Sequence, residues 1–183
     1  MIGKRNIEAG AAAAQGGAAK AARPLLFCGD LDIRIAADGT WFHEGRPIRR
    51  APLVKLFASV LTRDDGGDYW LVTPVERARI RVDDAPFLAV ELKAEGEGES
   101  QRLSFRTNLD EWVTAGPSHP IACRAQPGGR EPAPYLLVRD GLEAKLTRAV
   151  YYELAERAVE VMRAGRPCLG VHSEGAFFPL EPA

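Results

Sequence analysis

Residues 38–61 read DGTWFHEGRPIRRAPLVKLFASVL, and this stretch decides the fold that the sequence predicts. Asp38 and Gly39 signal a hairpin turn, because glycine tolerates the positive φ that such turns require. Pro52 suits the first turn of a helix, where its missing N–H has no partner to lose. The residues that follow are apolar at helical spacing: Leu53, Leu56, Phe57, Val60 and Leu61. The stretch therefore predicts a turn followed by an amphipathic helix.

A second section, further along the chain, is similar. Asp140 and Gly141 precede a predicted helix over residues 146–162, which Gly165 would end. Its apolar residues align in register with those of the first helix, so that Leu56 and Leu154 are expected to be equivalent core positions. We predict two copies of one turn–helix–strand unit. The alternative is that any two amphipathic helices align this well.

A region of β-strands lies between the two sections. Leu88, Val90 and Leu92 alternate with small or polar residues, which is the period-two pattern of a half-buried strand. The alternation resumes at Leu103 and Phe105 in a returning strand. The sequence therefore predicts an α+β fold of two related lobes, each a turn–helix–strand unit, with antiparallel β structure between them.

Composition gives the expected domain boundaries. Residues 1–23 are rich in alanine and glycine and are predicted to form a disordered tail, followed by an N-terminal lobe over 24–86 and a C-terminal lobe over 87–183. The formal net charge of -1 gives no strong attraction to nucleic acid or to an anionic membrane. No apolar run approaches the roughly 18 residues of a membrane-spanning helix. We expect neither nucleic acid nor membrane as a partner.

The three cysteines, Cys28, Cys123 and Cys168, are far apart and form no CxxC motif. An odd number at such spacing favours small buried thiols in a reducing compartment over disulfides or a zinc site. We therefore expect a cytoplasmic protein without a metal or cofactor.

Candidate catalytic groups are few, and none forms a known motif. The stretch 107–112 is the densest in polar and aromatic residues; Asn108 or Asp110 could cap a short helix there, and Asn108 or Trp112 could contact a ligand. His119 lies in a loop and could titrate near neutral pH. A hydrolase-like enzyme that uses Asn108, Asp110 and His119 is therefore one hypothesis. It requires the three side chains to converge on one point.

Arg50 and Arg148 each precede or begin a predicted helix, where free N–H groups and the helix dipole favour an anion. One interpretation gives each arginine a structural ion pair with Asp38 or Asp140. The other gives at least one of them a ligand-binding role, in a cleft without a carboxylate partner.

Several blocks of sequence, met in order along the chain, resemble the bacterial family of unknown function DUF1285. The blocks are CGD at 28–30, DGTWF at 38–42, PLVKLF at 52–57, YWLVTPVE at 69–76, RTN at 106–108 and GLEA at 141–144. The resemblance covers the chain after residue 24. It implies a two-part α+β fold with repeated motifs, no established activity, and a role in signal transduction suggested by structure. It supplies no catalytic residues.

We therefore expect a binding or regulatory module rather than an enzyme, acting on a small molecule, which the arginine hypothesis makes anionic, or on a protein partner. The expected ligand-binding residues are Arg50, Asn108, Trp112, His119 and Arg148. The hydrolase-like enzyme is the alternative, and the sequence leaves the oligomeric state open.

Overall fold

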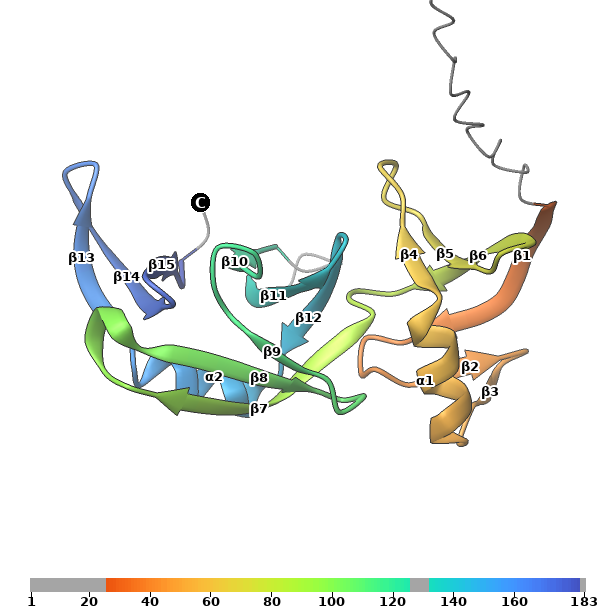
Figure 1. The fold of residues 1–183 in the computed structure, drawn as a ribbon, viewed down its shortest axis with the longest axis horizontal. Coiled ribbons are helices and arrows are strands. Elements are labelled where there is room, and N and C mark those ends of the chain that lie inside the picture. The colour runs from red at the N-terminus through yellow and green to blue at the C-terminus, as the bar shows by residue number, and fades with distance from the viewer. Residues whose placement is uncertain (1–25, 126–131, 182–183) are drawn as a thin grey trace, which may run out of the picture.

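A computed structural model describes residues 26–125 and 132–181, so the tail predicted for residues 1–23 lies outside the described residues. Within these ranges the chain forms three β-sheets, two α-helices and one short 3-10 helix, η1 (Gly98–Ser100). One sheet of six strands lies on one side of the molecule, and the other two sheets lie on the opposite side (Figure 1). Residues 83–86 connect the two sides.

The first sheet contains six strands. In spatial order they are β3 (Arg46–Pro47), β2 (Trp41–His43), β1 (Leu26–Ile35), β6 (Glu76–Val82), β5 (Tyr69–Val72) and β4 (Leu61–Arg63). β1 and β6 are parallel, and the other neighbours are antiparallel. Helix α1 (Ala51–Ser59) connects β3 to β4, and its Phe57 ring stacks on Trp41 at 6.2 Å. The hairpin predicted at Asp38 forms, and the Asp38 carboxylate accepts a hydrogen bond from the Thr40 N–H at 2.9 Å.

The second sheet also contains six strands. Their order is β10 (Ile121–Arg124), β11 (Ala133–Arg139), β12 (Leu142–Leu146), β7 (Phe87–Glu95), β8 (Arg102–Thr107) and β9 (Trp112–Thr114). β12 and β7 are parallel, whereas β7 and β8 form the antiparallel pair that the alternation predicted. Helix α2 (Arg148–Ala155) follows β12 and packs against β7.

The third sheet is a meander of β13 (Val159–Arg163), β14 (Arg166–Ser173) and β15 (Ala176–Pro179). Ser173 joins it to the second sheet, because its buried hydroxyl donates to the Ala115 carbonyl at 2.7 Å and accepts from the Leu103 N–H at 2.9 Å. Leu154 and Val171 are fully buried in the same core.

The predicted fold class is wrong. The described chain is mostly β, and its sheets contain up to six strands, so it is not an α+β protein of two turn–helix–strand lobes. The helix predicted over residues 146–162 ends at Ala155, and its second half is strand β13. Val159 and Val161 are β-branched and alternate, which favours a strand. Gly165 does not end a helix: it stands with Ala164 at positive φ (78° and 50°) in the β13–β14 hairpin turn.

The alignment of the two helices is also wrong. Leu154 has an exposed fraction of 0%, whereas Leu56 is 59% exposed. The residues that α1 buries are Val54 and Ala58. Phe57 and Val60 of the predicted face still pack against the core, but Leu56 does not, so the two helices bury different positions and these contacts give the proposed repeat no support.

Replacing Leu154 with Ala should lower the free energy of unfolding by about 2–5 kcal/mol, because it removes a fully buried side chain from the shared core. Leu56→Ala is the matched control and should change it by less than about 0.5 kcal/mol. Urea unfolding of both variants measures the difference. Equal losses for the two variants would contradict the burial that the structure assigns.

Candidate functional site

Asn108 lies in the turn between β8 and β9, where the structure forms no capped helix. Its side-chain carbonyl accepts a hydrogen bond from the Leu88 N–H at 3.0 Å, and its own N–H donates to the Leu88 carbonyl at 2.8 Å. Gly39 lies close to the side-chain amide of Asn108: a Cβ added to Gly39 would stand only 2.7 Å from the amide nitrogen. Asn108 therefore fastens the β8–β9 turn to strand β7, and Gly39 of the β1–β2 turn leaves room for its amide.

Asp110, in the same turn, joins the two sides of the molecule through an exposed ion pair. Its carboxylate contacts the Lys55 ammonium of α1 at 2.7 Å and the Arg106 guanidinium at 3.1 Å. The hydrogen bond from Lys55, followed by the contact with Arg106, lowers the pKa of the Asp110 carboxyl. Trp112 lies in β9 opposite Arg106 and is about half exposed.

The side chain of His119 is turned to the protein backbone. Its Nδ1 lies 3.1 Å from the Leu137 carbonyl, and because a carbonyl only accepts, Nδ1 carries the proton. Asn108, Asp110 and His119 thus have separate partners, and no interaction within the described ranges links His119 to either of the others. The convergence that the hydrolase hypothesis requires finds no support in these contacts.

The two arginines are both exposed at helix starts. Arg50 stands at the N-cap of α1, and Arg148 is the first residue of α2. Over the part of the chain that the structure describes, neither forms the ion pair with Asp38 or Asp140 that the structural interpretation expects.

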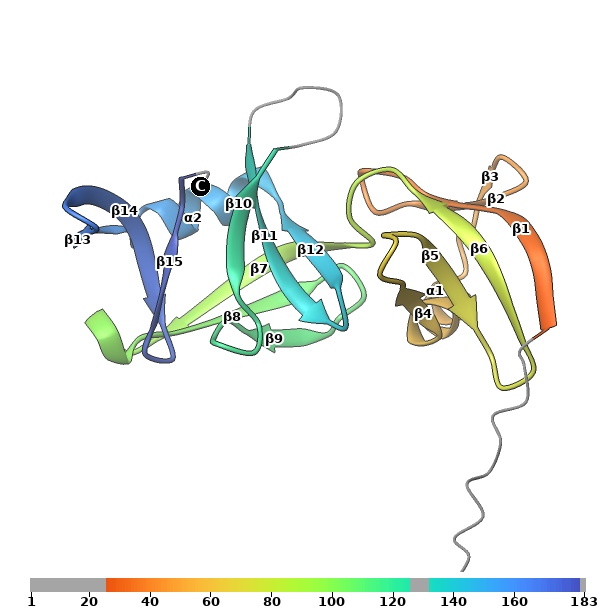
Figure 2. The same cartoon turned by 90° about the horizontal axis from the view of Figure 1, so that it is seen from above.

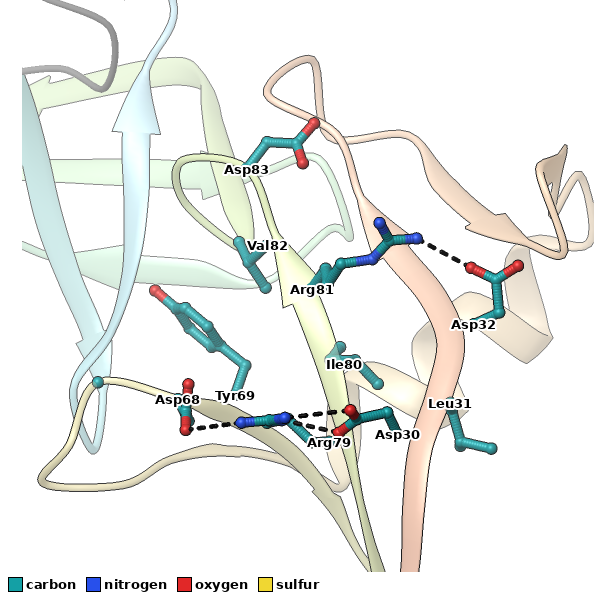
Figure 3. A pocket seen from close by; sticks show the side chains of 11 residues that line it. Asp30, Leu31, Asp32, Asp68, Tyr69, Arg79, Ile80, Arg81, Val82 and Asp83 are labelled. Atoms are coloured by element: carbon teal, nitrogen blue, oxygen red, sulfur yellow. Dashed lines mark hydrogen bonds and ion pairs between the residues drawn. The ribbon is translucent and has the colours of Figure 1, made fainter.

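The first sheet carries a hollow of about 670 Å³ on strands β1, β5 and β6, in which acidic and basic side chains alternate (Figure 3). Arg79 makes a two-point contact with Asp30 at 2.8 and 3.0 Å and reaches Asp68 at 3.4 Å. Arg81 contacts Asp32 at 2.9 Å. Because these carboxylates already face guanidinium groups, an incoming ion would have to displace an existing pair. We interpret this hollow as a surface ion-pair network.

A buried polar cluster lies where residues 83–86 meet the second sheet. The Asp84 side chain is only 4% exposed; its carboxylate accepts a hydrogen bond from the Tyr135 hydroxyl at 2.8 Å and contacts the Lys145 ammonium at 2.7 Å. The Arg124 guanidinium stacks 3.7 Å from the centre of the Tyr135 ring and forms an ion pair with Glu143. The sequence analysis missed this cluster, because its members come from four separate segments.

Lys145 also lines a cavity of about 270 Å³ at the start of α2, which we call the Arg148 cavity. Two cations, Lys145 and Arg148, and two phenols, Tyr151 and Tyr152, contribute its polar groups. The rest of its wall is apolar and consists of Pro132, Ala133, Pro134 and Leu146. Of the residues predicted from sequence to bind a ligand, Arg148 thus lines a cavity together with other polar side chains.

The fold defines a class of protein built from two six-stranded sheets and a small third sheet. Two family models match the chain: "Domain of unknown function (DUF1285), N-terminal domain" over residues 24–85, and "Protein of unknown function (DUF1285), C-terminal domain" over residues 86–180. The chain therefore belongs to the DUF1285 family, as the sequence resemblance indicated. No curated protein matches it.

Two solved structures are similar. A DUF1285 family protein from Silicibacter pomeroyi DSS-3 is 43% identical, with a TM-score of 0.78, and the match covers 90% of each chain. A DUF1285 family protein from Shewanella baltica OS155 is 31% identical, with a TM-score of 0.54 over 69% of this chain and 92% of that one.

Asp84→Ala should lower the free energy of unfolding by about 3–5 kcal/mol, because it removes the buried carboxylate that accepts the Tyr135 hydrogen bond and balances the charge of Lys145. Asp65→Ala, at an exposed turn position, is the control and should be nearly neutral. Chemical denaturation measures both. A loss below about 1 kcal/mol in Asp84→Ala would show that the cluster does not hold residues 83–86 in place.

Alkaline pH should destabilise the protein in part through Tyr135. Burial, and then the hydrogen bond to Asp84, raises the pKa of its phenol above the ordinary value of 10.0. The unfolded chain therefore loses this proton first, and stability that is present below about pH 10 falls as the pH rises further. Tyr135→Phe should show a smaller loss of unfolding free energy between about pH 8 and about pH 11 than the wild type or the control Tyr152→Phe. If the unfolding free energy fell equally steeply with pH in all three proteins, this role of Tyr135 would be contradicted.

Proposed function

We propose that this chain is a non-enzymatic regulatory module of the cytoplasm that recognises a small anionic molecule at the Arg148 cavity. One observation carries the proposal. Arg148 lines a cavity, together with a second cation and two tyrosines, and has no carboxylate partner among the described residues. This is the arrangement that a ligand-binding arginine needs, since an anion at the Arg148 guanidinium displaces no ion pair of that arginine with the described residues.

The electrostatics of the cavity favour an anion. Asp84 compensates the charge of Lys145, so Arg148 supplies the net positive charge. Arg148 begins helix α2, whose N-cap, Thr147, makes no side-chain cap hydrogen bond and whose first turn contains no acidic residue. The positive end of the helix dipole and the free N–H groups of the first turn therefore add to the field of the guanidinium.

The remaining lining restricts the ligand. A volume of about 270 Å³ lies at the small end of ligand pockets, and tyrosine and proline side chains offer flat, apolar contact surface. The Lys145 ammonium has a fixed position because Asp84 holds it. These features support a ligand that combines one carboxylate or phosphate with a small planar or apolar group.

A regulatory role is supported by where the cavity lies. Helix α2 connects the second sheet to the third, and Val150 and Leu154 pack its buried face into the core. A ligand that stabilises the first turn of α2 therefore acts on the segment that joins two sheets. This is the kind of element through which a binding event is transmitted in signal transduction.

A thermal-shift titration with phenyl phosphate, benzoate and inorganic phosphate, and with benzyl alcohol as the neutral reference, tests the proposal. An anionic probe at ~100 times its Kd should add roughly 2.7 kcal/mol to stability, and benzyl alcohol should add little. Arg148→Ala should remove the effect of the anions. Arg157→Ala, an exposed arginine outside the cavity, should preserve it.

Two outcomes would contradict the proposal. In one, no anionic probe stabilises the wild type at millimolar concentration. In the other, Arg148→Ala responds to the anions as strongly as Arg157→Ala does, which would place their binding elsewhere on the molecule.

A further inference from the structure

A second hollow, of about 640 Å³, lies between the edge of the second sheet and the third sheet. Strand β15 runs beside β10 without joining its sheet, as Figure 2 shows, and the β13–β14 hairpin contributes further lining residues. We call this hollow the hairpin trough. It shares no lining residue with the Arg148 cavity.

The walls of the trough are apolar. They consist of Ile121, Ala122 and Cys123 from β10, Pro167 and Cys168 from β14, and Pro179 from β15. The Cys123 thiol donates a hydrogen bond to the Leu180 carbonyl at 3.1 Å, and burial raises its pKa. The thiol therefore stays protonated at neutral pH and contributes a small neutral surface, so the wall suits a hydrocarbon rather than a reactive ligand.

Two arginines line the trough at the hairpin turn. Arg163 and Arg166 face each other across β13 and β14, on either side of Ala164 and Gly165. The Arg163 guanidinium lies 5.6 Å from the centre of the Phe177 ring, and neither arginine forms an ion pair within residues 26–125 and 132–181. Glu181 is the carboxylate that also lines the trough, so the two guanidinium groups leave a net positive charge there.

We infer that the hairpin trough binds a free medium-chain fatty acid. Its hydrocarbon chain lies between β10 and β14, and its carboxylate lies at Arg163 and Arg166. An apolar slot with cationic groups at the hairpin turn matches a ligand whose single charge sits at the end of an apolar chain. A guanidinium group can bind a carboxylate through two parallel hydrogen bonds, which fixes the direction of the chain in the slot. The inference is independent of the function proposed for the Arg148 cavity.

Isothermal titration of the full chain with hexanoate, octanoate and decanoate, each below its micelle concentration, tests the inference. Affinity should rise about fourfold with each added methylene, because each buries further apolar surface. Decanol should bind at least about tenfold more weakly than decanoate, since it lacks the charge that the arginines recognise.

Two variants separate the parts of the site. The double variant Arg163→Ala/Arg166→Ala should lose the preference for decanoate over decanol, whereas Arg46→Ala/Arg49→Ala, at exposed positions in β3 and in its connection to α1, should keep it. Ala122→Phe, at an exposed position of β10 that lines the trough, should weaken both ligands by about tenfold or more.

An affinity that does not change with chain length would overturn the inference, and so would decanoate binding that survives in both trough variants. Arg148→Ala serves as the cross-control. It should leave decanoate binding unchanged, so a failure here is distinguishable from a failure at the Arg148 cavity. A loss of decanoate binding in Arg148→Ala would show that the fatty acid binds in the Arg148 cavity and not in the hairpin trough.

Discussion

The Asp84 carboxylate is almost completely removed from solvent, on the short connection between the first and second sheets. Removing an ionised carboxylate from water costs several kcal/mol unless it finds a partner, and here it finds the Lys145 ammonium and the Tyr135 hydroxyl. Both partners belong to neighbouring strands of the second sheet. The burial therefore fixes where the chain enters that sheet.

Further contacts between the two sides of the molecule also hold the first sheet and the second sheet together. Arg139 of β11 donates to the carbonyl of Ala58, close to the C-terminus of α1, at 2.9 Å, so a cation lies where the helix dipole is negative. Arg63 of β4 lies 3.4 Å from the Gly141 carbonyl and 3.9 Å from the Glu143 carboxylate. Most of these groups are partly exposed and individually weak. Together with the buried carboxylate, they hold α1 and β4 against the second sheet.

Local signals in the sequence predicted the parts of this fold that depend on neighbouring residues. The hairpin at Asp38 and the alternating strands around Leu92 formed because turn chemistry and period two suffice to specify them. The predictions were wrong where contacts with a distant segment determine the secondary structure or the burial of a residue. The apolar residues after Ala155 fit a helix or a strand, and pairing with β14 selects the strand. Leu56 fits an apolar helix face, but no sheet lies over it.

The Asp84 cluster and the Arg148 cavity could also not be predicted from local sequence, and their geometry shows why. Adjacent residues on an extended chain point in opposite directions, and Asp83 accordingly pairs with the exposed Arg34 while Asp84 turns inward. Sequence reasoning can predict that the two carboxylates point apart, but it cannot predict which one is buried. The partners of Asp84, Tyr135 and Lys145, lie 51 and 61 residues away from it in the chain. Arg148 was predicted as a candidate because a helix start is a local signal. Its cavity was not, because β11 and β12 build the opposite wall.

Helix α2 links the two hollows of the C-terminal half, and its length gives that link a physical consequence. At eight residues it is too short to be stable alone, so its position depends on the packing of Val150 and Leu154. The Arg148 cavity lies at its first turn, and the hairpin that forms one wall of the trough follows its last turn. If both proposed ligands bind, an anion at Arg148 would stabilise the helix from one end, and a ligand that fixes β13 and β14 would stabilise it from the other. Each ligand would then lower the cost of ordering the segment that the other requires, and such a coupling would have to be equal in both directions.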